Sequence, residues 1–373
     1  MPRSSETLPS SFSLSRTDTS VLKALAMIFI VTHNFMHLVT PAPSENEFAF
    51  YSAEGIWRAL TICFVYPGEI PHVVFSFFGH YGVVAFVFLS GYGLTRKLIT
   101  TSTGDGHLRV ARQVAGKQIL KMIQLIAVGA AFVLAWRFAT EGSGFSLDSE
   151  FGALLKLLTF TNNLRPDSLW GFVSVWWFFA LIAQLYVLFP LFVWGLQRCP
   201  TTTIGAGVAA LGAAEVFGPV CHGVVLYATP LSHSIIFLTG MWLAKGNALP
   251  ERIFSWSWCV FLLAQFVPLL FPLSFLAVLF CALDLWRRYG NRLSANRPLV
   301  WFGGLSSFVF LVHGWMRHPV VDWLDQVQRT QFAANGSFHT ELTWAVFVGW
   351  FIAVVGMAWE SRALYRFLSH VRH

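Results

Sequence analysis

Two histidines, His33 and His37, and one lysine, Lys23, interrupt an otherwise apolar segment from Val21 to Val39. Ionisable side chains at membrane depth are costly and are functional candidates by default. Residues four apart lie on one face of a helix, so both imidazoles are expected to point the same way. The ten positions from Lys23 to His33 correspond to roughly 15 Å of helical rise, about half of a hydrocarbon core that is roughly 30 Å thick. The pattern therefore predicts a titratable base near the membrane centre and a cation at one surface.

The composition indicates that these residues lie in a multi-pass membrane protein. Of the 373 residues, 55% are hydrophobic and 12% are charged, and the mean hydropathy is +0.60, whereas soluble domains carry roughly 25% charged residues. Apolar runs of roughly 17–25 residues can cross a bilayer as helices. They predict an all-α fold of about ten transmembrane helices, near residues 20–41, 72–95, 117–138, 170–195, 202–217, 224–244, 254–270, 273–286, 298–316 and 342–367.

The charged residues predict the orientation of these spans, because cytoplasmic loops concentrate Lys and Arg. With the N-terminus inside, most of the 25 Lys and Arg fall at inside ends, so both termini are expected to be cytoplasmic. The net charge of +7 then reflects topology and requires no nucleic-acid partner. Residues 1–17 are interpreted as a flexible cytoplasmic tail and residues 18–373 as a single membrane domain. The outside connections 42–71, 139–169 and 317–341 are apolar enough to carry interfacial or re-entrant helices.

Four motifs follow one another along the chain. Each places glycine, aromatic or polar residues inside an apolar span: Lys23 with His33 to His37; Phe78-Gly79-His80-Tyr81-Gly82 with Ser90-Gly91-Tyr92-Gly93; Trp176-Trp177-Phe178-Phe179 with Gln184-Leu185-Tyr186; and Gly303-Gly304-Leu305-Ser306-Ser307 with His313. Together they resemble the acyltransferase-3 family of bacterial membrane proteins, which transfer acyl groups, usually acetyl from acetyl-CoA, onto glycans of the cell envelope.

The resemblance extends from the first predicted span to the ninth. It implies an O-acyltransferase of the bacterial inner membrane that uses acyl-CoA, most simply acetyl-CoA, as a co-substrate and holds no permanently bound cofactor. Its expected partners are membrane lipid and an acceptor that is an envelope glycan (O-antigen, capsule or exopolysaccharide) or a lipid-linked saccharide.

The resemblance also implies roles for individual residues. His33 is the expected catalytic base, with His37 beside it, and Lys23 takes part in donor use. Arg96 and Lys97 belong to a basic set at the inside ends of the first three spans that could hold the CoA phosphates; the set also contains Arg109, Arg112, Lys117 and Lys121. The motif residues expected to bind substrate are His80, Tyr81, Ser90, Tyr92, Trp177, Gln184 and His313.

The chain departs from the family pattern in two places. Many members have Arg where this chain has Lys23, with ten residues before the histidine rather than the nine found here. Many also carry a glutamate near the motif that contains Gln184, where this chain has none. A carboxylate partner for His33 would have to come from elsewhere, or be dispensed with.

The chemistry and its alternatives can be stated from the residues alone. As a hydroxyl attacks a thioester, its proton must leave, and a neutral histidine is a common acceptor. The histidines could instead only join helices by hydrogen bonds, and the motif glycines could only permit close packing. No metal site is expected, because the glutamate of helical metalloprotease motifs is missing. The other class is a transporter or flippase for a saccharide or lipid-linked substrate, but the two halves show no internal repeat.

Overall fold

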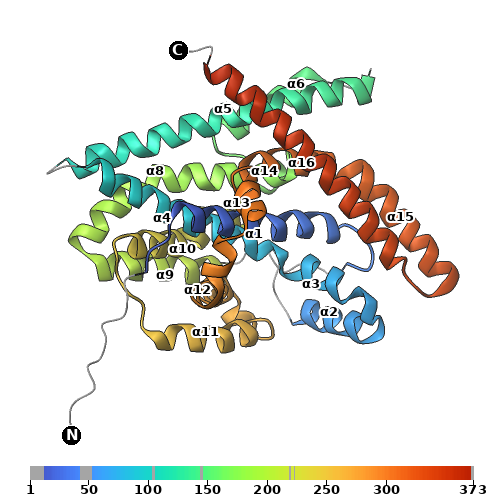
Figure 1. Cartoon of the computed structure of the whole chain (residues 1–373), viewed down its shortest axis with the longest axis horizontal. Coiled ribbons are helices and arrows are strands. Elements are labelled where there is room, and N and C mark those ends of the chain that lie inside the picture. Colours follow the sequence, from blue (N-terminus) through green and yellow to red (C-terminus); the bar gives the residue numbers. More distant parts are fainter. Residues whose placement is uncertain are drawn as a thin grey trace, which may run out of the picture.

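Helices form nearly all of the regular structure in the computed structural model, which describes residues 12–42, 53–102, 106–142, 146–217, 220–221 and 223–370 (Figure 1). The α-helices are α1 (Arg16–Met36), α2 (Glu54–Val65), α3 (Ile70–Phe78), α4 (Gly82–Thr101), α5 (His107–Glu141), α6 (Leu147–Leu158), α7 (Pro166–Leu169), α8 (Trp177–Arg198), α9 (Pro200–Val216), α10 (Pro230–Ala244), α11 (Glu251–Ala264), α12 (Phe271–Ser294), α13 (Arg297–Gly303), α14 (Ser306–Met316), α15 (His318–Asn335) and α16 (Thr340–His370).

Short elements join these helices. The 3₁₀ helices are η1 (Pro67–Glu69), η2 (Gly79–Tyr81), η4 (Ser174–Trp176), η5 (Leu226–Ala228) and η6 (Pro268–Leu270), and the strands are β1 (Val220–Cys221) and β2 (Val224–Val225). The two strands pair antiparallel in a small hairpin. The predicted all-α class is confirmed.

The described residues contain six helices that are long and apolar enough to cross a membrane: Arg16–Met36, Pro67–Thr101, His107–Thr140, Ser174–Arg198, Pro268–Ser294 and Thr340–Leu368. The pair α13 and α14, which is bent by 68°, is a seventh candidate. Three other predicted spans fold as the shorter helices α9, α10 and α11, of 17, 15 and 14 residues. The multi-pass membrane architecture is confirmed; by length and composition six or seven of the predicted spans qualify in the described residues, and the exact number stays a prediction.

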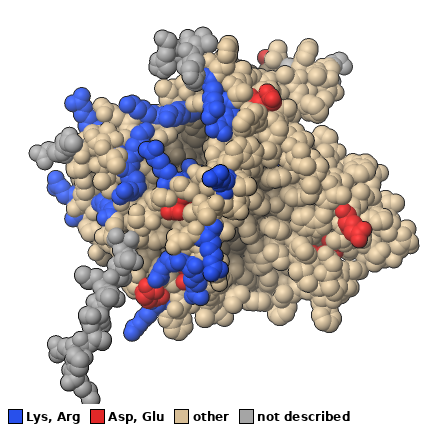
Figure 2. Space-filling view, in the orientation of Figure 1, with Lys and Arg blue, Asp and Glu red and all other residues tan. Residues whose placement is uncertain are grey.

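The charged side chains are distributed unevenly between the two ends of the molecule. Lys and Arg gather at the end where α1 begins, together with some acidic side chains, whereas acidic side chains without Lys or Arg beside them are visible at the other end (Figure 2). α2, α3 and α15 lie at that opposite end (Figure 1). Three connections predicted to carry interfacial helices do contain helices, namely α2, α6 and α15. The uneven distribution is what the predicted orientation requires, and the cytoplasmic location of the termini stays a prediction.

The start of α1 is fixed by its own capping residues. The Ser15 hydroxyl accepts from the backbone N of Asp18 at 3.1 Å, and the Asp18 carboxylate accepts from the backbone N of Ser15 at 2.8 Å. Such a reciprocal pair satisfies two donors that a helix start otherwise leaves unpaired. Just before it, Leu14 is buried and its backbone N donates to the Tyr92 hydroxyl at 2.8 Å. Residues 1–11 of the predicted tail lie outside the described residues.

Motif glycines bring helices into contact at backbone distance. A Cβ atom on Gly303 would collide with the backbone oxygen of Ser20 in α1, at the point where α13 ends. A Cβ atom on Gly91 of α4 would collide with the backbone oxygen of Phe237 in α10. The predicted packing role of small residues therefore holds at these two contacts, the first between α13 and α1 and the second between α4 and α10.

Candidate active site

The His33 side chain is held by a backbone carbonyl. It is 3% exposed, and its Nδ1 atom lies 2.9 Å from the backbone oxygen of Ser76 in α3. A carbonyl can only accept a hydrogen bond, so Nδ1 carries the proton and donates. In the neutral ring the basic lone pair is then on Nε2. The orienting partner that the sequence left open is thus a carbonyl, and it selects the tautomer that a general base needs.

Two further histidines lie against His33, and we call His33, His37 and His80 the imidazole cluster. His37 donates from Nδ1 to the backbone oxygen of His33 at 2.7 Å, and the two rings stack with centroids 4.6 Å apart at 15°. The His80 ring meets His33 edge-on, with centroids 5.6 Å apart. Within the described part of the chain, no group of three or more His, Cys, Asp or Glu side chains is placed to hold a metal ion. The stacking contact with His37 and the edge contact with His80 restrict the orientation of the His33 ring.

Gly79 allows the second motif to approach the first. A Cβ atom on Gly79 would collide with the His33 Cβ and would lie 2.7 Å from the backbone oxygen of Phe29. One turn further on, a Cβ atom on Gly82 would lie 2.6 Å from the backbone oxygen of Ala26. The glycines of this motif therefore serve the site, because they let His80 reach His33.

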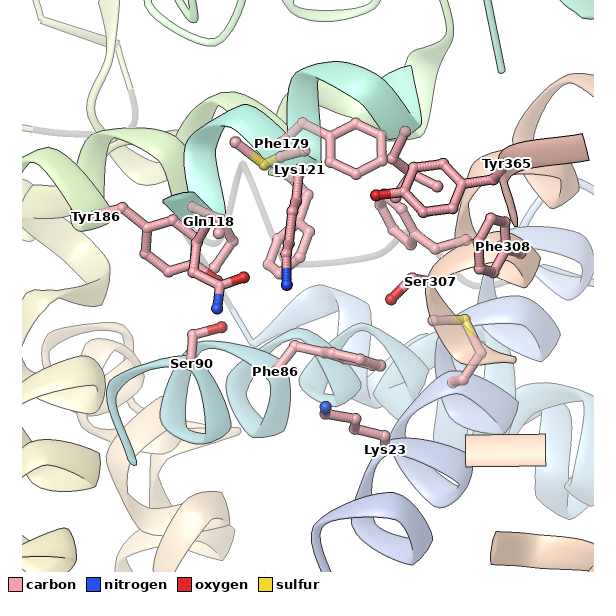
Figure 3. Close-up of a pocket in the computed structure, with 16 residues that line it drawn as sticks. Lys23, Phe86, Ser90, Gln118, Lys121, Phe179, Tyr186, Ser307, Phe308 and Tyr365 are labelled. Atoms are coloured by element: carbon pink, nitrogen blue, oxygen red, sulfur yellow. The ribbon is translucent and has the colours of Figure 1, made fainter. Parts of the chain in front are cut away.

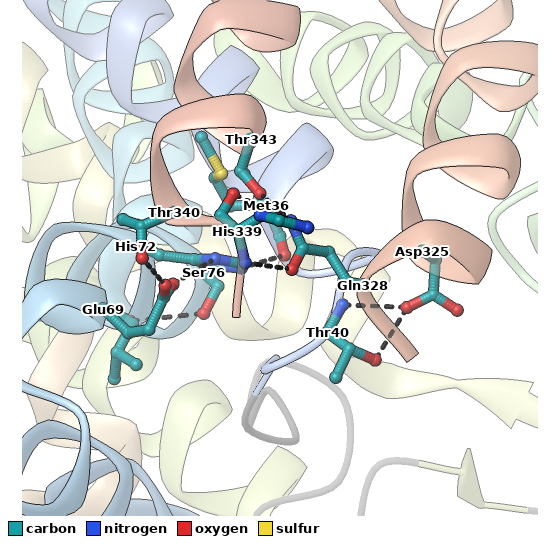
Figure 4. A network of polar contacts seen from close by, with 11 residues as sticks. Met36, Thr40, Glu69, His72, Ser76, Asp325, Gln328, His339, Thr340 and Thr343 are labelled. Carbon is teal, nitrogen blue, oxygen red and sulfur yellow. Dashed lines mark hydrogen bonds and ion pairs between the residues drawn. The ribbon is translucent and has the colours of Figure 1, made fainter. Parts of the chain in front are cut away.

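The buried carboxyl group of Glu69 belongs to a hydrogen-bond network at the C-terminal end of α1 (Figure 4). Glu69 and His72 are 2% and 0% exposed, and His72 Nδ1 lies 3.1 Å from Glu69 Oε2. His72 Nε2 donates to the backbone oxygen of Met36 at 2.9 Å, and the Thr340 hydroxyl bonds to the other oxygen of Glu69. Because the Met36 carbonyl only accepts, His72 Nε2 carries a proton. The hydrogen bond between His72 Nδ1 and Glu69 Oε2 therefore contains a second proton, which the pair shares. This network ties α3, which carries the Ser76 carbonyl, to α1 and α16.

His313 is bound on a second network beside the cluster. Its Nδ1 donates to the backbone oxygen of Phe310 at 3.0 Å, which leaves Nε2 to accept from the Asn34 amide at 3.3 Å. Arg317, 4% exposed, donates from Nη1 to the backbone and side-chain oxygens of Asn34, at 2.7 and 2.8 Å, and from Nη2 to the Ser174 hydroxyl at 2.9 Å. His313 and Arg317 thus hold α14 and η4 against the residue that follows His33.

Beside the other half of α1 lies a cavity of about 370 Å³, which we call the Lys23 cavity (Figure 3). Lys23 from α1 and Lys121 from α5 enter it from opposite sides with their ammonium groups pointing inward. Its other lining residues are mostly aromatic or aliphatic, with a few hydroxyl and amide groups: Met27, Phe86, Ser90, Gln118, Met122, Leu125, Phe178, Phe179, Ile182, Tyr186, Ser307, Phe308, Phe310 and Tyr365.

All four sequence motifs contribute to this wall: the first through Lys23, the second through the predicted residue Ser90, the third through Phe178, Phe179 and Tyr186, and the fourth through Ser307. His33 is not among the described residues that line the cavity, but Met27 is. Six helical positions separate Met27 from His33, which correspond to roughly 9 Å of rise. In the described ranges, no ion pair joins Lys23 or Lys121 to a carboxylate. Two cations that face each other across an apolar cavity suit a ligand with negative charge.

Both predicted tyrosines act away from this cavity. The Tyr81 hydroxyl donates to the Ser274 hydroxyl at 2.7 Å and accepts from the Gln265 amide at 3.2 Å, which joins η2 to α11 and α12. The Tyr92 hydroxyl accepts from the backbone of Leu14. The structure therefore gives each tyrosine a bond between chain segments and brings neither to the Lys23 cavity.

The remaining predicted residues also lie elsewhere. Gln184 exchanges two amide hydrogen bonds with Asn163, at 3.0 and 2.9 Å, so its polar groups fasten the connection between α6 and α7. Trp177 is buried at the start of α8. Arg96 and Lys97 lie near the end of α4 at the basic end of the molecule and are not among the residues that line the cavity.

Sequence reasoning missed Ser76, Glu69, His72 and Arg317. Ser76 acts through its backbone, so no residue type could have indicated it. Glu69 and Arg317 fall in connections that were predicted to lie outside the spans. Charged residues are common there and do not indicate a functional site. The spacing of Glu69 and His72 was a usable signal, because residues three apart lie on one helix face.

The fold and this site define a multi-pass membrane protein with a buried, oriented histidine and a cationic cavity beside the same helix. The sequence model of a family described as an acyltransferase domain, acyltransferase-3, matches residues 18–360. The chain belongs to the acyltransferase-3 family and is a membrane acyltransferase. No curated protein and no solved structure matches it.

Proposed function

We propose that this protein transfers an acetyl group from acetyl-CoA to a hydroxyl group of an envelope saccharide in the bacterial inner membrane, with His33 as the general base. The observation that carries the proposal is the hydrogen bond from His33 Nδ1 to the Ser76 carbonyl, at 2.9 Å. It requires the tautomer whose Nε2 can accept a proton, inside a family of acyltransferases.

The reaction needs two proton movements at one nitrogen. His33 Nε2 takes the proton of the acceptor hydroxyl as that oxygen bonds to the carbonyl carbon of the thioester. The carbon–sulfur bond then breaks, and the CoA sulfur leaves with the proton from Nε2. The His33 ring ends neutral, in the tautomer in which it started, because its Nδ1–H stays on Ser76 throughout. A positioned base of this kind contributes a rate factor of about 10²–10⁴.

The Lys23 cavity supports the assignment of CoA as donor. CoA combines a polyanionic head with a long neutral arm, and this cavity combines two ammonium groups with aromatic and aliphatic walls. Its volume of about 370 Å³ lies in the range of roughly 300–1,000 Å³ found for small-molecule pockets. We assign Lys23 and Lys121 to the phosphates or the pantetheine arm, with Arg96 and Lys97 at the entrance.

The direct test replaces His33 with alanine and measures acetyl transfer from radiolabelled acetyl-CoA to envelope glycan, in membranes with matched amounts of protein. We expect transfer to fall by about 10²–10⁴-fold. The matched control is His339→Ala, because His339 is exposed and its side chain makes none of the contacts of the imidazole cluster. Equal transfer by the His33→Ala and wild-type proteins would refute the mechanism.

A further inference from the structure

A second cavity, also of about 370 Å³, lies away from the Lys23 cavity, and we call it the outer aromatic cavity. Its lining includes four aromatic side chains, Trp136, Trp170, Phe172 and Trp315, together with Arg137 and His318. No step of the proposed mechanism uses it. The question is which chemical class such a lining would bind.

The two cavities lie along the same helix. Lys121 and Arg137 belong to α5 and line the Lys23 cavity and the outer aromatic cavity, respectively. Sixteen positions separate them, which correspond to roughly 24 Å of helical rise, most of a hydrocarbon core of roughly 30 Å. α5 runs along the long axis of the molecule from its basic end (Figure 1). The two cavities therefore serve opposite ends of the membrane domain.

The aromatic rings offer flat apolar faces next to hydrogen-bonding groups. Trp136 and Trp315 lie with ring centroids 5.9 Å apart and tilted at 47°. The lining also contains the hydroxyl groups of Thr140 and Ser174. Hydroxyl groups can both donate to and accept from the hydroxyl groups of a ligand. Apolar faces with hydroxyl groups at their edges are the surface of a pyranose ring.

The charges of this cavity are already compensated. Arg137 donates from Nη1 to both carboxylate oxygens of Glu150, at 2.6 and 2.5 Å, and from Nη2 to the backbone oxygen of Phe172 at 2.7 Å. Burial first, and then the positive charge of Arg317, lower the pKa of His318 from its ordinary value, which favours the neutral ring. A lining with a neutralised arginine and a neutral imidazole favours an uncharged ligand over a phosphate or an acidic headgroup.

A chain of hydrogen bonds joins this cavity to the helix of the catalytic base. Ser174 lines the cavity and accepts from Arg317, and Arg317 donates to both oxygens of Asn34. Asn34 directly follows His33 in α1. A ligand in the outer aromatic cavity would therefore lie against the same rigid assembly that holds the base.

We propose that the outer aromatic cavity binds a neutral pyranose unit of the acceptor saccharide, stacked on Trp136 and Trp170, from the end of the membrane domain opposite to the donor. This assignment rests on the proposed function, since it names the acceptor site of that reaction. The cavity is a binding subsite, and its residues position the acceptor rather than move protons.

The first experiment measures binding by the full-length protein in lipid nanodiscs. Tryptophan fluorescence is titrated with neutral methyl pyranosides, and separately with inorganic phosphate and with phosphocholine. We expect a saturable change with at least one pyranoside and none with the two phosphate compounds. Trp136→Ala and Trp170→Ala should each weaken that binding by about threefold to tenfold. Trp136 and Trp170 are 46% and 50% exposed, so their removal leaves no cavity in the core; the control Trp194→Ala removes a ring that is also 46% exposed and does not line the cavity.

The second experiment separates this proposal from the proposed function. In membranes, the double variant W136A/W170A should raise the KM for the acceptor by at least the larger single-variant factor and leave the KM for acetyl-CoA unchanged. Unchanged acceptor KM, or saturation by phosphocholine instead of a pyranoside, would overturn the acceptor site and leave the role of His33 standing. If the His33→Ala protein transfers acetyl groups normally while a pyranoside still binds, the proposed function fails and the saccharide site stands.

Discussion

The imidazole cluster and the Lys23 cavity lie on the same helix and are built in opposite ways. In the cluster, glycines and ring contacts bring side chains close, and the His33 and His37 Nδ1 atoms are bound by carbonyl oxygens. In the cavity, two ammonium groups face open volume, and no described ion pair neutralises them. The Nδ1 atoms of His33 and His37 in the cluster are hydrogen-bonded within the protein, whereas the two ammonium groups of the cavity are placed to bind a ligand.

This difference indicates a division of labour. A general base works best when its ring is held in one orientation before the substrate arrives, because no reorganisation is then needed during the reaction. A site for a large charged donor must stay open and charged instead. Under the proposed function, we expect substitutions in the cluster to change the rate or the stability and substitutions in the cavity to change the affinity for the donor.

The largest effect is expected from His33→Asn. The Asn side-chain amide can still donate to the Ser76 carbonyl, but it has no basic nitrogen in the place of Nε2. We expect acetyl transfer to fall by about 10²–10⁴-fold with little change in melting temperature. Transfer assays and thermal unfolding of the same preparation check this. A protein that melts much earlier would show that the hydrogen bond to Ser76 was not preserved.

Glu69→Gln is expected to cost about 3 kcal/mol of stability, because it replaces the carboxylate of a buried, hydrogen-bonded pair by a neutral amide. The measurement is thermal unfolding of the full chain in detergent. The control is Glu341→Gln, since Glu341 is exposed and directly follows Thr340 at the start of α16. Because His72, which joins α3 to α1, would lose its charged partner, the rate of transfer should fall as well, with the donor KM unchanged. Equal melting of both variants would contradict the role of the network.

Gly79→Ala tests the closeness of α1 and η2. The added methyl group would collide with His33 and with the backbone of α1, and overpacking of this kind typically costs about 1–3 kcal/mol. Gly93→Ala is the matched control in the same motif, because a Cβ atom there meets nothing within 4 Å. We expect lower stability and lower kcat only for the Gly79 variant; similar behaviour of the two would show that the contact can relax.

The smallest effect is expected from Lys23→Gln. Losing one charge-assisted hydrogen bond to the donor should raise the KM for acetyl-CoA by about tenfold, with kcat at saturating donor little changed. Lys156→Gln is the control, because Lys156 is an exposed lysine of α6 at 52% side-chain exposure. A fall in kcat without a change in KM would move Lys23 from the donor site to the chemistry.

The sequence predicted the helical membrane class and the helix that carries His33, because both follow from composition and period alone. Three of the ten predicted spans form helices of 17, 15 and 14 residues, and the exact number of membrane crossings stays a prediction. Residues 224–225 form strand β2, and α10 starts only at Pro230, because proline fits the first turn of a helix and marks its start. The predicted packing role of motif glycines holds at Gly79, Gly82, Gly91 and Gly303 but not at Gly93. The sequence could not tell that Gly79 packs on the helix that carries His33.

The roles of individual polar residues were harder to predict from the sequence. Gln184 and Tyr92 are polar groups in apolar helices, and such groups are conspicuous whether they bind a ligand or a neighbouring segment. Their partners, Asn163 and the backbone of Leu14, are distant in the sequence or belong to the main chain. Only the fold could show that both are bound within the protein.

The sequence by itself determined that the protein lies in a membrane, that it is helical, and that His33 and Lys23 belong to one helix. These features depend only on composition and on neighbours along the chain. The tertiary structure decided which nitrogen of His33 is basic, that Lys121 faces Lys23, and that Glu69 is buried. These features depend on a carbonyl in α3, a side chain in α5 and a hydroxyl in α16. Such contacts between distant segments exist only once the helices pack.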